Sequence, residues 1–294
     1  MQTLTEEPVR EAAAPGYRPH ATFSFRTEAR RQLSRRRTQF ALGFMVLLPL
    51  IVLAAFEFDS GQGDNNDRNG QFASLVRVAT DGGLNFALFT LLVSSSFLLI
   101  VVVALFCGDT VSSDATWGSL RYLLAIPVPR ARLLGIKLLV AAVTSLVALA
   151  LLTGTALLLG TLRYGWHPLR SMVAGDLPAG TGLVRLLAIV GYLAVSLLVV
   201  AGLAFLLSVS IDAPLGAVGG AVLLQILSSI LDQITALGSI RPYLPTHYAQ
   251  AWLGLLSNPV QTDDLIKGCV SAVIYGTLFL GLAWWRFLRK DIVS

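Results

Sequence analysis

The densest set of groups able to bind a partner lies between residues 107 and 137 of an otherwise apolar chain. The segment contains three residues that can cap the start of a helix, because their side-chain oxygens accept bonds from free backbone amides: Ser112, Ser113 and Asp114. Apolar residues at helical spacing follow: Trp117, Leu120 and Leu124. Arg121 lies beside this apolar face, and Pro127 and Pro129 end the helix. Because Trp and Arg dominate the energetics of protein interfaces, the pattern predicts a short helix that docks a partner protein.

A second set of polar side chains falls on one face of an apolar stretch near residue 225. Gln225, Ser228, Ser229 and Asp232 have the spacing i, i+3, i+4 and i+7. An earlier apolar stretch contains three more polar residues, Asn85, Ser94 and Ser95. Polar groups that face lipid are costly, since an acid at mid-membrane costs about 2.5–3.5 kcal/mol on insertion scales. These side chains therefore either face a substrate path or bond one helix to another, and both interpretations stay open.

Several kinds of catalytic chemistry are missing from the sequence. The three lysines, Lys137, Lys267 and Lys290, all lie outside any Gly-x-x-x-x-Gly-Lys-Ser/Thr loop, so the chain has no cradle for nucleotide phosphates. The histidines and cysteines are scattered, with spacings that fit neither a metal site nor a disulfide framework. His167 and His247 are isolated and are expected to be neither ligands nor catalytic groups. We expect no catalytic site, metal or cofactor in this chain.

The elements that hold these residues are membrane spans. Hydrophobic residues make up 55% of the 294 positions and charged residues 13%, which is about half the charge of a soluble domain. A helix needs about 20 apolar residues to cross a hydrocarbon core of about 30 Å. Six stretches approach that length, which predicts an all-α transmembrane domain over residues 39–288, with spans at about 39–56, 83–107, 136–160, 185–210, 213–232 and 266–286.

The distribution of charge gives an orientation. With six spans both termini share a side, and 15 of the 22 Lys and Arg residues lie on that side. The positive-inside rule places this side in the cytoplasm, which predicts a multi-pass protein of the plasma (inner) membrane. Residues 1–21 are expected to be a flexible cytoplasmic tail, and residues 289–294 form a second tail.

Residues 22–38 combine many arginines with a few apolar residues at helical spacing. This pattern predicts an amphipathic helix lying in the membrane interface, with its arginines near anionic headgroups. Its apolar stripe consists of Phe23, Phe25, Ala29 and Leu33. The alternative is a solvated basic tail that only enforces the topology.

The segment between the second and third spans resembles the signature of the type-2 ABC transporter permeases. That signature is an acidic residue, Gly-Thr-Leu-Arg, a Leu-Leu run, Pro-x-x-Arg and then Lys. The matching residues are Asp114, Gly118-Ser119-Leu120-Arg121, Leu123-Leu124, Pro127-Val128-Pro129-Arg130 and Lys137. Asp replaces the commoner Glu, Ser119 replaces Thr, and Ala125 stands where Ser is usual. Before the sixth span, Arg241-Pro-Tyr-Leu-Pro-Thr-His-Tyr248 is similar to the family's Leu-Pro-x-x-Tyr stretch.

The resemblance covers the whole chain and implies a plan. The family has an N-terminal interfacial helix, six transmembrane helices, a cytoplasmic coupling helix between spans two and three, and short half-inserted helices before span six. The resemblance implies that the coupling to the ATPase involves Asp114, Trp117, Gly118, Leu120, Arg121, Leu124, Pro127 and Arg130. It also implies that spans two and five line the path, and that an external cap includes Pro242, Tyr243, Pro245 and Tyr248.

The expected function is therefore the permease subunit of an ATP-driven exporter. The resemblance implies a separate P-loop ATPase subunit that carries ATP and Mg, and a second permease that is identical or homologous. Family members export drugs, antibiotics, lipids or glycans, and the low charge of the path favours an amphiphilic cargo. Lipid surrounds the chain, and nucleic acid is not an expected partner. The Ala-, Leu-, Gly- and Arg-rich composition is typical of a GC-rich bacterial genome.

Two other classes of function remain as alternatives. A stand-alone ion-coupled carrier favours intramembrane acids and broken helices near the bilayer midplane, whereas none of the six spans carries a central charge. A non-transporting membrane anchor would have the same loop without a usable polar path. A membrane-embedded hydrolase would need grouped catalytic residues at membrane depth, and the spans contain no histidine.

Overall fold

A computed structural model describes residues 24–60, 71–116, 129–171 and 175–289, and most of them are helical. Within these ranges the α-helices are α1 (Phe25–Leu33), α2 (Arg36–Ser60), α3 (Gln71–Ala79), α4 (Gly83–Ser95), α5 (Leu98–Thr116), α7 (Arg130–Tyr164), α8 (Ala179–Ser196), α9 (Leu198–Ser210), α10 (Pro214–Gln233) and α11 (Asp263–Arg289). Two 3-10 helices and an antiparallel pair of strands complete the described chain: η1 (Thr235–Tyr243), η2 (Ala251–Leu256), β1 (Leu169–Ser171) and β2 (Gly175–Leu177).

Six helical segments of the described chain are long and apolar enough to cross a membrane, which confirms the expected number. They are Arg36–Phe58, Leu98–Thr116, Arg130–Tyr164, Ala179–Ser210, Pro214–Gln233 and Asp263–Arg289. The chain is therefore a predominantly helical, multi-pass membrane protein. The third span is longer than the expected 136–160, because α7 has 35 residues and so extends about 52 Å.

Two of the spans expected from the sequence, the second at 83–107 and the fourth at 185–210, are each interrupted near their middle. The turn Ser96–Phe97 separates α4 from α5, and Leu197 separates α8 from α9. Just before the first interruption, the hydroxyls of Ser94 and Ser95 donate to carbonyls of their own helix, at 2.6 and 3.1 Å. Such bonds compete with the backbone ladder and bend helices. The continuous helix expected over 83–107 is therefore two helices.

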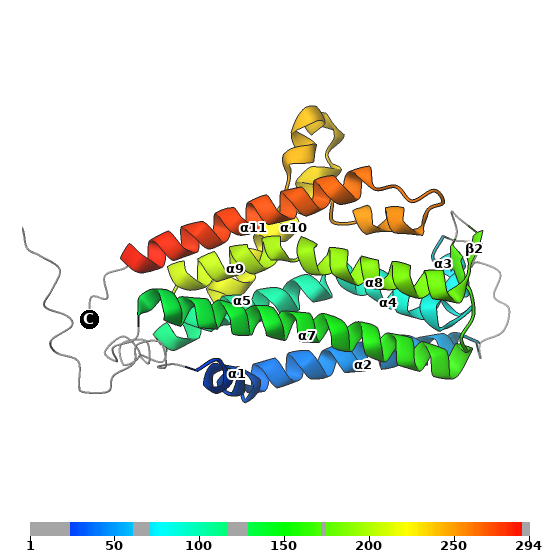
Figure 1. The fold of residues 1–294 in the computed structure, drawn as a ribbon, viewed down its shortest axis with the longest axis horizontal. Helices are drawn as coiled ribbons and strands as arrows, with labels where there is room; N and C mark the ends of the chain where they lie inside the picture. The colour runs from blue at the N-terminus through cyan, green and yellow to red at the C-terminus, as the bar shows by residue number, and fades with distance from the viewer. Residues whose placement is uncertain (1–23, 61–70, 117–128, 172–174, 290–294) are drawn as a thin grey trace, which may run out of the picture.

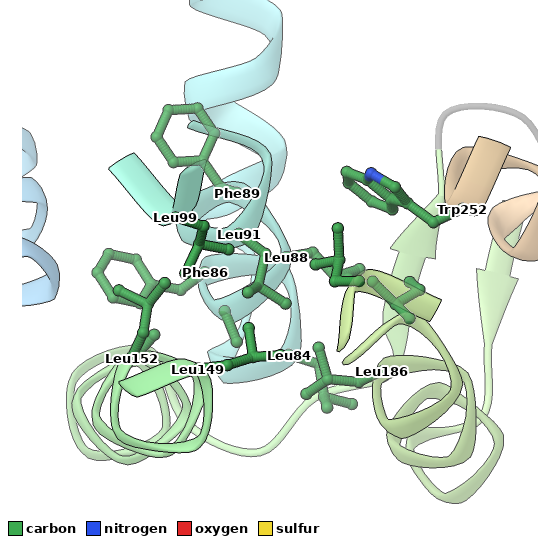
Figure 2. Close-up of a cluster of buried hydrophobic side chains, with 14 of the residues drawn as sticks. Leu84, Phe86, Leu88, Phe89, Leu91, Leu99, Leu149, Leu152, Leu186 and Trp252 are labelled. Carbon is green, nitrogen blue, oxygen red and sulfur yellow. The ribbon is translucent and has the colours of Figure 1, made fainter. Parts of the chain in front are cut away.

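α4 lies inside the bundle and is buried on all sides. Ten of its 13 residues are buried, which is the pattern of a helix surrounded by other helices. Figure 2 shows its apolar side chains packed against Leu149 and Leu152 of α7, Leu186 of α8 and Trp252 of η2. α4 is therefore part of the core.

α9 and α11 approach closely because two glycines face each other. A Cβ on Gly202 of α9 would lie 3.0 Å from the carbonyl oxygen of Gly276 in α11, so a larger residue would force the helices apart. Small residues at such crossings are typical of helix packing in membranes. The pair holds the sixth span against the second half of the fourth.

The two ends of the bundle differ in the elements that they carry. At the left of Figure 1 lie α1, the start of α7 and the end of α11, where Arg130 Nη1 donates to the carbonyl oxygen of Leu288 at 3.5 Å. At the other end lie α3 and the β hairpin, with an ion pair of 2.7 Å between Arg163 and Glu57. We call these the α1 end and the hairpin end. The first described helix and the end of the last one thus lie at the same end of the bundle.

Candidate functional site

Charged side chains form a cluster at the α1 end, where α5 and α7 flank residues 117–128 in the sequence. This charge cluster contains three acids and four bases: Glu28, Arg31, Arg35, Arg37, Asp109, Asp114 and Lys137. The acids and the lysine are each at most 5% exposed. Ionised groups are buried in proteins only where they are paired, so the pairing ties together the elements that carry them.

Lys137 of α7 is the centre of the charge cluster. Its Nζ lies 2.9 Å from Glu28 Oε1 and 2.5 Å from Asp114 Oδ2. It also donates to the carbonyl oxygen of Thr110 at 3.2 Å. An ammonium has three hydrogens to donate, and all three acceptors are provided here by α1 and α5. One side chain therefore joins three helices.

The arginines hold the two aspartates of α5 from the other side. Arg31 Nη2 lies 2.5 Å from Asp114 Oδ1, while Arg35 and Arg37 each pair with Asp109, at 2.8 and 3.1 Å. Burial alone would lower the pKa of Arg31, but its hydrogen bond to Asp114 and the attraction of nearby carboxylates outweigh burial and raise that pKa. The guanidinium therefore stays charged, and each aspartate is held by at least two bases.

α1 consequently docks onto the bundle through its polar face. Glu28 and Gln32 are each 2% exposed, whereas Leu33, from the expected apolar stripe, is 47% exposed. Of the range 22–38 that was expected to form one interfacial helix, Phe25–Leu33 forms α1 and the residues from Arg36 onward begin α2, and α1 lies crosswise to α2 in Figure 1. Phe25 and Ala29 are half-buried, and the pairs Glu28–Lys137 and Arg31–Asp114 hold α1 against α5 and α7.

The end of α5 is held by α9 as well. The backbone amides of Val111 and Ser112 both donate to Ser208 Oγ of α9, at 3.0 and 3.1 Å. Thr116 Oγ1 donates to the carbonyl oxygen of Asp212, in the α9–α10 turn, at 2.5 Å. α5 is therefore bonded to α1, α7, α9 and this turn immediately before residue 117. A displacement of the segment that follows would reach all of them.

The structure corrects the helix start that was expected at Ser112 to Asp114. α5 continues through these residues to Thr116, and the hydroxyls of Ser112 and Ser113 donate to carbonyls one turn earlier in the same helix. Inside a continuous helix the backbone amides donate to carbonyls one turn earlier, so the amides around Asp114 need no side-chain cap.

Most of the expected docking helix lies outside the described residues. These positions are Trp117, Gly118, Leu120, Arg121, Leu124 and Pro127. The other two residues assigned to the ATPase contact are described. Asp114 is 4% exposed inside the charge cluster and therefore forms no part of an outer surface. Arg130 is exposed at the start of α7.

A polar cavity of about 490 Å³ lies beside the interruption of the second span. Its walls are the turn between α4 and α5, the last turns of α10 and the segment between η1 and η2. Hydroxyl, amide and ionisable side chains line it, among them Ser95, Ser96, Gln225, Ser229, Asp232 and His247. The cavity therefore joins polar residues from parts of the sequence that are far apart.

The residues expected on a substrate path divide into two groups. Those that line the cavity are Ser95, Gln225, Ser229 and Asp232. Ser228 bonds Thr246, another lining residue, at 2.8 Å. Asn85 and Ser94 are instead buried in the bundle, where Asn85 bonds the backbone of Arg170 at 2.7 and 3.1 Å. The face of α10 thus borders the cavity, while these two residues of α4 bond within the bundle.

Thr246 and His247 line the cavity although sequence analysis did not select them. His247 Nδ1 lies 2.5 Å from Asp232 Oδ1, and Arg241 Nε lies 3.7 Å from the same oxygen. Thr246 and His247 occupy the two variable positions of the Leu-Pro-x-x-Tyr stretch. That motif was the available signal, because its fixed residues shape a turn that presents the variable ones to α10.

The expected cap residues hold this segment in place. The carbonyl oxygen of Tyr248 accepts a bond from the Tyr192 hydroxyl at 2.5 Å, and that of Tyr243 accepts one from the Tyr275 hydroxyl. The segment contains η1 and η2 where half-inserted helices were expected, and η1 projects sideways from the bundle (Figure 1). Pro242 and Tyr243 lie exposed on η1, and Pro245 is half-buried. None of the four expected cap residues, Pro242, Tyr243, Pro245 and Tyr248, lines the cavity.

Residues 45–293 match the family model described as a protein of unknown function, DUF2705. The chain belongs to the DUF2705 family. The match includes the whole cavity wall and three members of the charge cluster, Asp109, Asp114 and Lys137, whereas α1 precedes it. A search of curated proteins finds no match to the chain.

In this DUF2705 protein a single helix connects the two sites. Ile100, in the first turn of α5, lines the cavity, and Asp114, in its last turn, belongs to the charge cluster. Ile100 and Asp114 are 14 residues apart in α5, which separates them by about 21 Å along one rigid element. A packed helix of this kind can transmit a displacement from one end to the other.

Proposed function

We propose that this chain is the membrane subunit of an ATP-driven transporter of the type-2 ABC class, powered by a separate ATPase subunit. The observation that supports the proposal best is the bonding of α5. One end of this helix borders a polar cavity, and the other is locked to α1, α7 and α9 next to residues 117–128. A partner that moves that segment would move α5 and change the cavity.

In this proposal the α1 end faces the cytoplasm. Trp117 and Arg121 dock the ATPase, which binds ATP and Mg, and Asp114 and Lys137 hold the docking segment to the bundle. Binding of ATP closes the ATPase subunits, and α5 carries the motion to the cavity. Two permeases complete the unit, and the cargo is exported. The 15 Lys and Arg residues on this side, out of 22, support the orientation.

One observation favours the ion-coupled carrier as a second candidate. The helix breaks between α4 and α5 and between α8 and α9, and the cavity beside the first break holds the Asp232–His247 pair. Broken helices and an ionisable pair at a cavity are features of such carriers. The carrier would need no partner at residues 117–128, so a search for that partner separates the two proposals.

The first experiment is affinity purification of the tagged chain from membranes in mild detergent. We expect a P-loop ATPase to co-purify stoichiometrically, with measurable ATP hydrolysis. Trp117→Ala and Arg121→Ala should each reduce the recovered ATPase at least about tenfold, since anchor residues of this kind contribute 2 kcal/mol or more. Trp166→Ala and Arg77→Ala serve as matched controls, because both side chains are exposed at the hairpin end.

The outcomes are distinct. Recovery of the ATPase that depends on Trp117 and Arg121 but not on the controls supports the proposal. A chain that purifies alone, with transport that persists in cells lacking the ATPase, supports the carrier. An ATPase that binds equally to all four variants would mean that residues 117–128 do not form the docking surface.

A further inference from the structure

Gln225 is a largely buried residue in the wall of the polar cavity. The residue is 7% exposed, and its carboxamide forms no hydrogen bond with any residue in the described ranges. The hydroxyl of Ser229, one turn further along α10, donates to the main-chain carbonyl oxygen of Gln225 at 3.0 Å and leaves the carboxamide unbonded. Because Gln225 lines the cavity, its amide can bond to water or to a molecule that enters. An amide in this position is available to a ligand.

The ionisable residues of the cavity wall are already paired with each other. Asp232 bonds His247 at 2.5 Å, and Arg241 lies 3.7 Å from the same carboxylate oxygen. The remaining polar residues of the wall carry amides and hydroxyls, among them Gln233, Gln250 and Ser96. A charged ligand would therefore lose water without gaining a free counterion, which is costly in a buried site.

We propose that this cavity binds an uncharged amphiphile whose hydroxyl- or amide-bearing head bonds to Gln225. The carboxamide offers two donors and one acceptor, and Ile100 and Ala249 provide apolar contacts for the rest of the molecule. The volume of about 490 Å³ is in the range of small-molecule sites. That this ligand is the exported cargo rests on the proposed function; the binding itself does not.

The test measures equilibrium binding to the full chain in lipid nanodiscs. The probes are three tritiated amphiphiles with the same alkyl chain: octyl glucoside, octyltrimethylammonium and octyl sulfate, each below its micellar concentration. Empty nanodiscs give the background from partition into lipid. We expect saturable binding of the glucoside and at least tenfold weaker binding of the two charged probes.

Substitution of Gln225 identifies the site. Gln225→Leu should weaken glucoside binding at least tenfold, and Gln225→Glu should shift the preference toward octyltrimethylammonium. Gln261→Leu is the matched control, because Gln261 is exposed before α11, and it should bind as the unaltered chain does. Gln225→Asn, which keeps a shorter amide, replaces Gln225→Leu if the latter does not give a monodisperse protein.

Equal binding of the charged probes would overturn the proposal, and so would unchanged glucoside binding by a folded Gln225→Leu variant. Binding that never exceeds the level of empty nanodiscs would overturn it as well. None of these outcomes depends on an ATPase. A chain that binds octyl glucoside through Gln225 but recovers no ATPase would refute only the proposed function, and the reverse result would refute only the site.

Discussion

Lys137 decides the local structure at the α1 end because it neutralises two buried carboxylates at once. Its ammonium lies 2.9 Å from Glu28 and 2.5 Å from Asp114, and the lysine is 1% exposed. The sequence pattern singled out Lys137 as the last residue of the permease-like signature, without a reason for its position. The structure supplies one, since the lysine joins α7 to the helix that precedes residues 117–128.

Replacement of this lysine should therefore be severe. Lys137→Met leaves two carboxylates buried without their shared partner, and we expect a loss of about 3–5 kcal/mol in the free energy of unfolding. Lys267→Met is the control, because Lys267 is exposed and forms a long surface ion pair of 3.7 Å with Asp264 on the same helix. The free energy of unfolding of this variant should change by no more than about 0.5 kcal/mol. Unfolding by SDS in mixed micelles measures both. Equal midpoints for the two variants would contradict the role of Lys137.

At the scale of the element, the spans are held by two different kinds of contact. α1, α5 and α7 are joined by ion pairs, whereas α9 and α11 are joined by close approach of their backbones at Gly202 and Gly276. In lipid, apolar side chains gain little by leaving the solvent, so close packing and hydrogen bonds have to bring helices together. This explains why glycine is tolerated at these positions despite its low helix propensity.

The close approach gives a second prediction. Gly202→Ala adds a methyl group 3.0 Å from the Gly276 carbonyl oxygen, and the overpacking should destabilise the protein by about 1–3 kcal/mol. Gly191→Ala is the control, because a Cβ there meets no atom within 4 Å, and alanine should stabilise α8 by up to about 1 kcal/mol. The same SDS titration measures both. If Gly202→Ala also raised the midpoint, the helices would not be in backbone contact.

At the scale of the whole molecule, α5 places the cavity and the charge cluster on one rigid body. The cluster lies at the α1 end, and the cavity lies beside the other end of α5, at the interruption of the second span. Two sites so connected are coupled if a partner at one end has two positions. In the proposed transporter that partner is the ATPase, and its two positions are set by ATP.

A cysteine at Ser96 reports this coupling. Ser96 lines the cavity, Cys107 is buried, and Cys269 can be replaced by serine so that one accessible thiol remains. We expect a non-hydrolysable ATP analogue to change the rate of maleimide labelling at Ser96→Cys several-fold in the purified complex. A cysteine at Gln261, outside the cavity, should label at an unchanged rate. A rate at Ser96→Cys that responds to pH but not to the analogue would favour the ion-coupled carrier.

The sequence alone determined the membrane class, the number of spans and the polar face of α10. These features follow from composition and helical spacing, which are local and survive any arrangement of the helices. It also indicated the signature around Asp114 and the stretch before the last span. The boundaries of the spans were less certain, because hydropathy does not register a helix that continues past the hydrocarbon core, as α7 does.

Only the tertiary structure decided which side chains meet. The arginines of residues 22–38 predicted a helix on the membrane surface, but their partners Asp109 and Asp114 lie more than 70 positions away, so the inward turn of the polar face of α1 could not be foreseen. In the same way, Asn85 and Gln225 have similar side chains in apolar spans. One bonds a backbone inside the bundle and the other lines a cavity, because burial and partners depend on helix packing rather than on residue type.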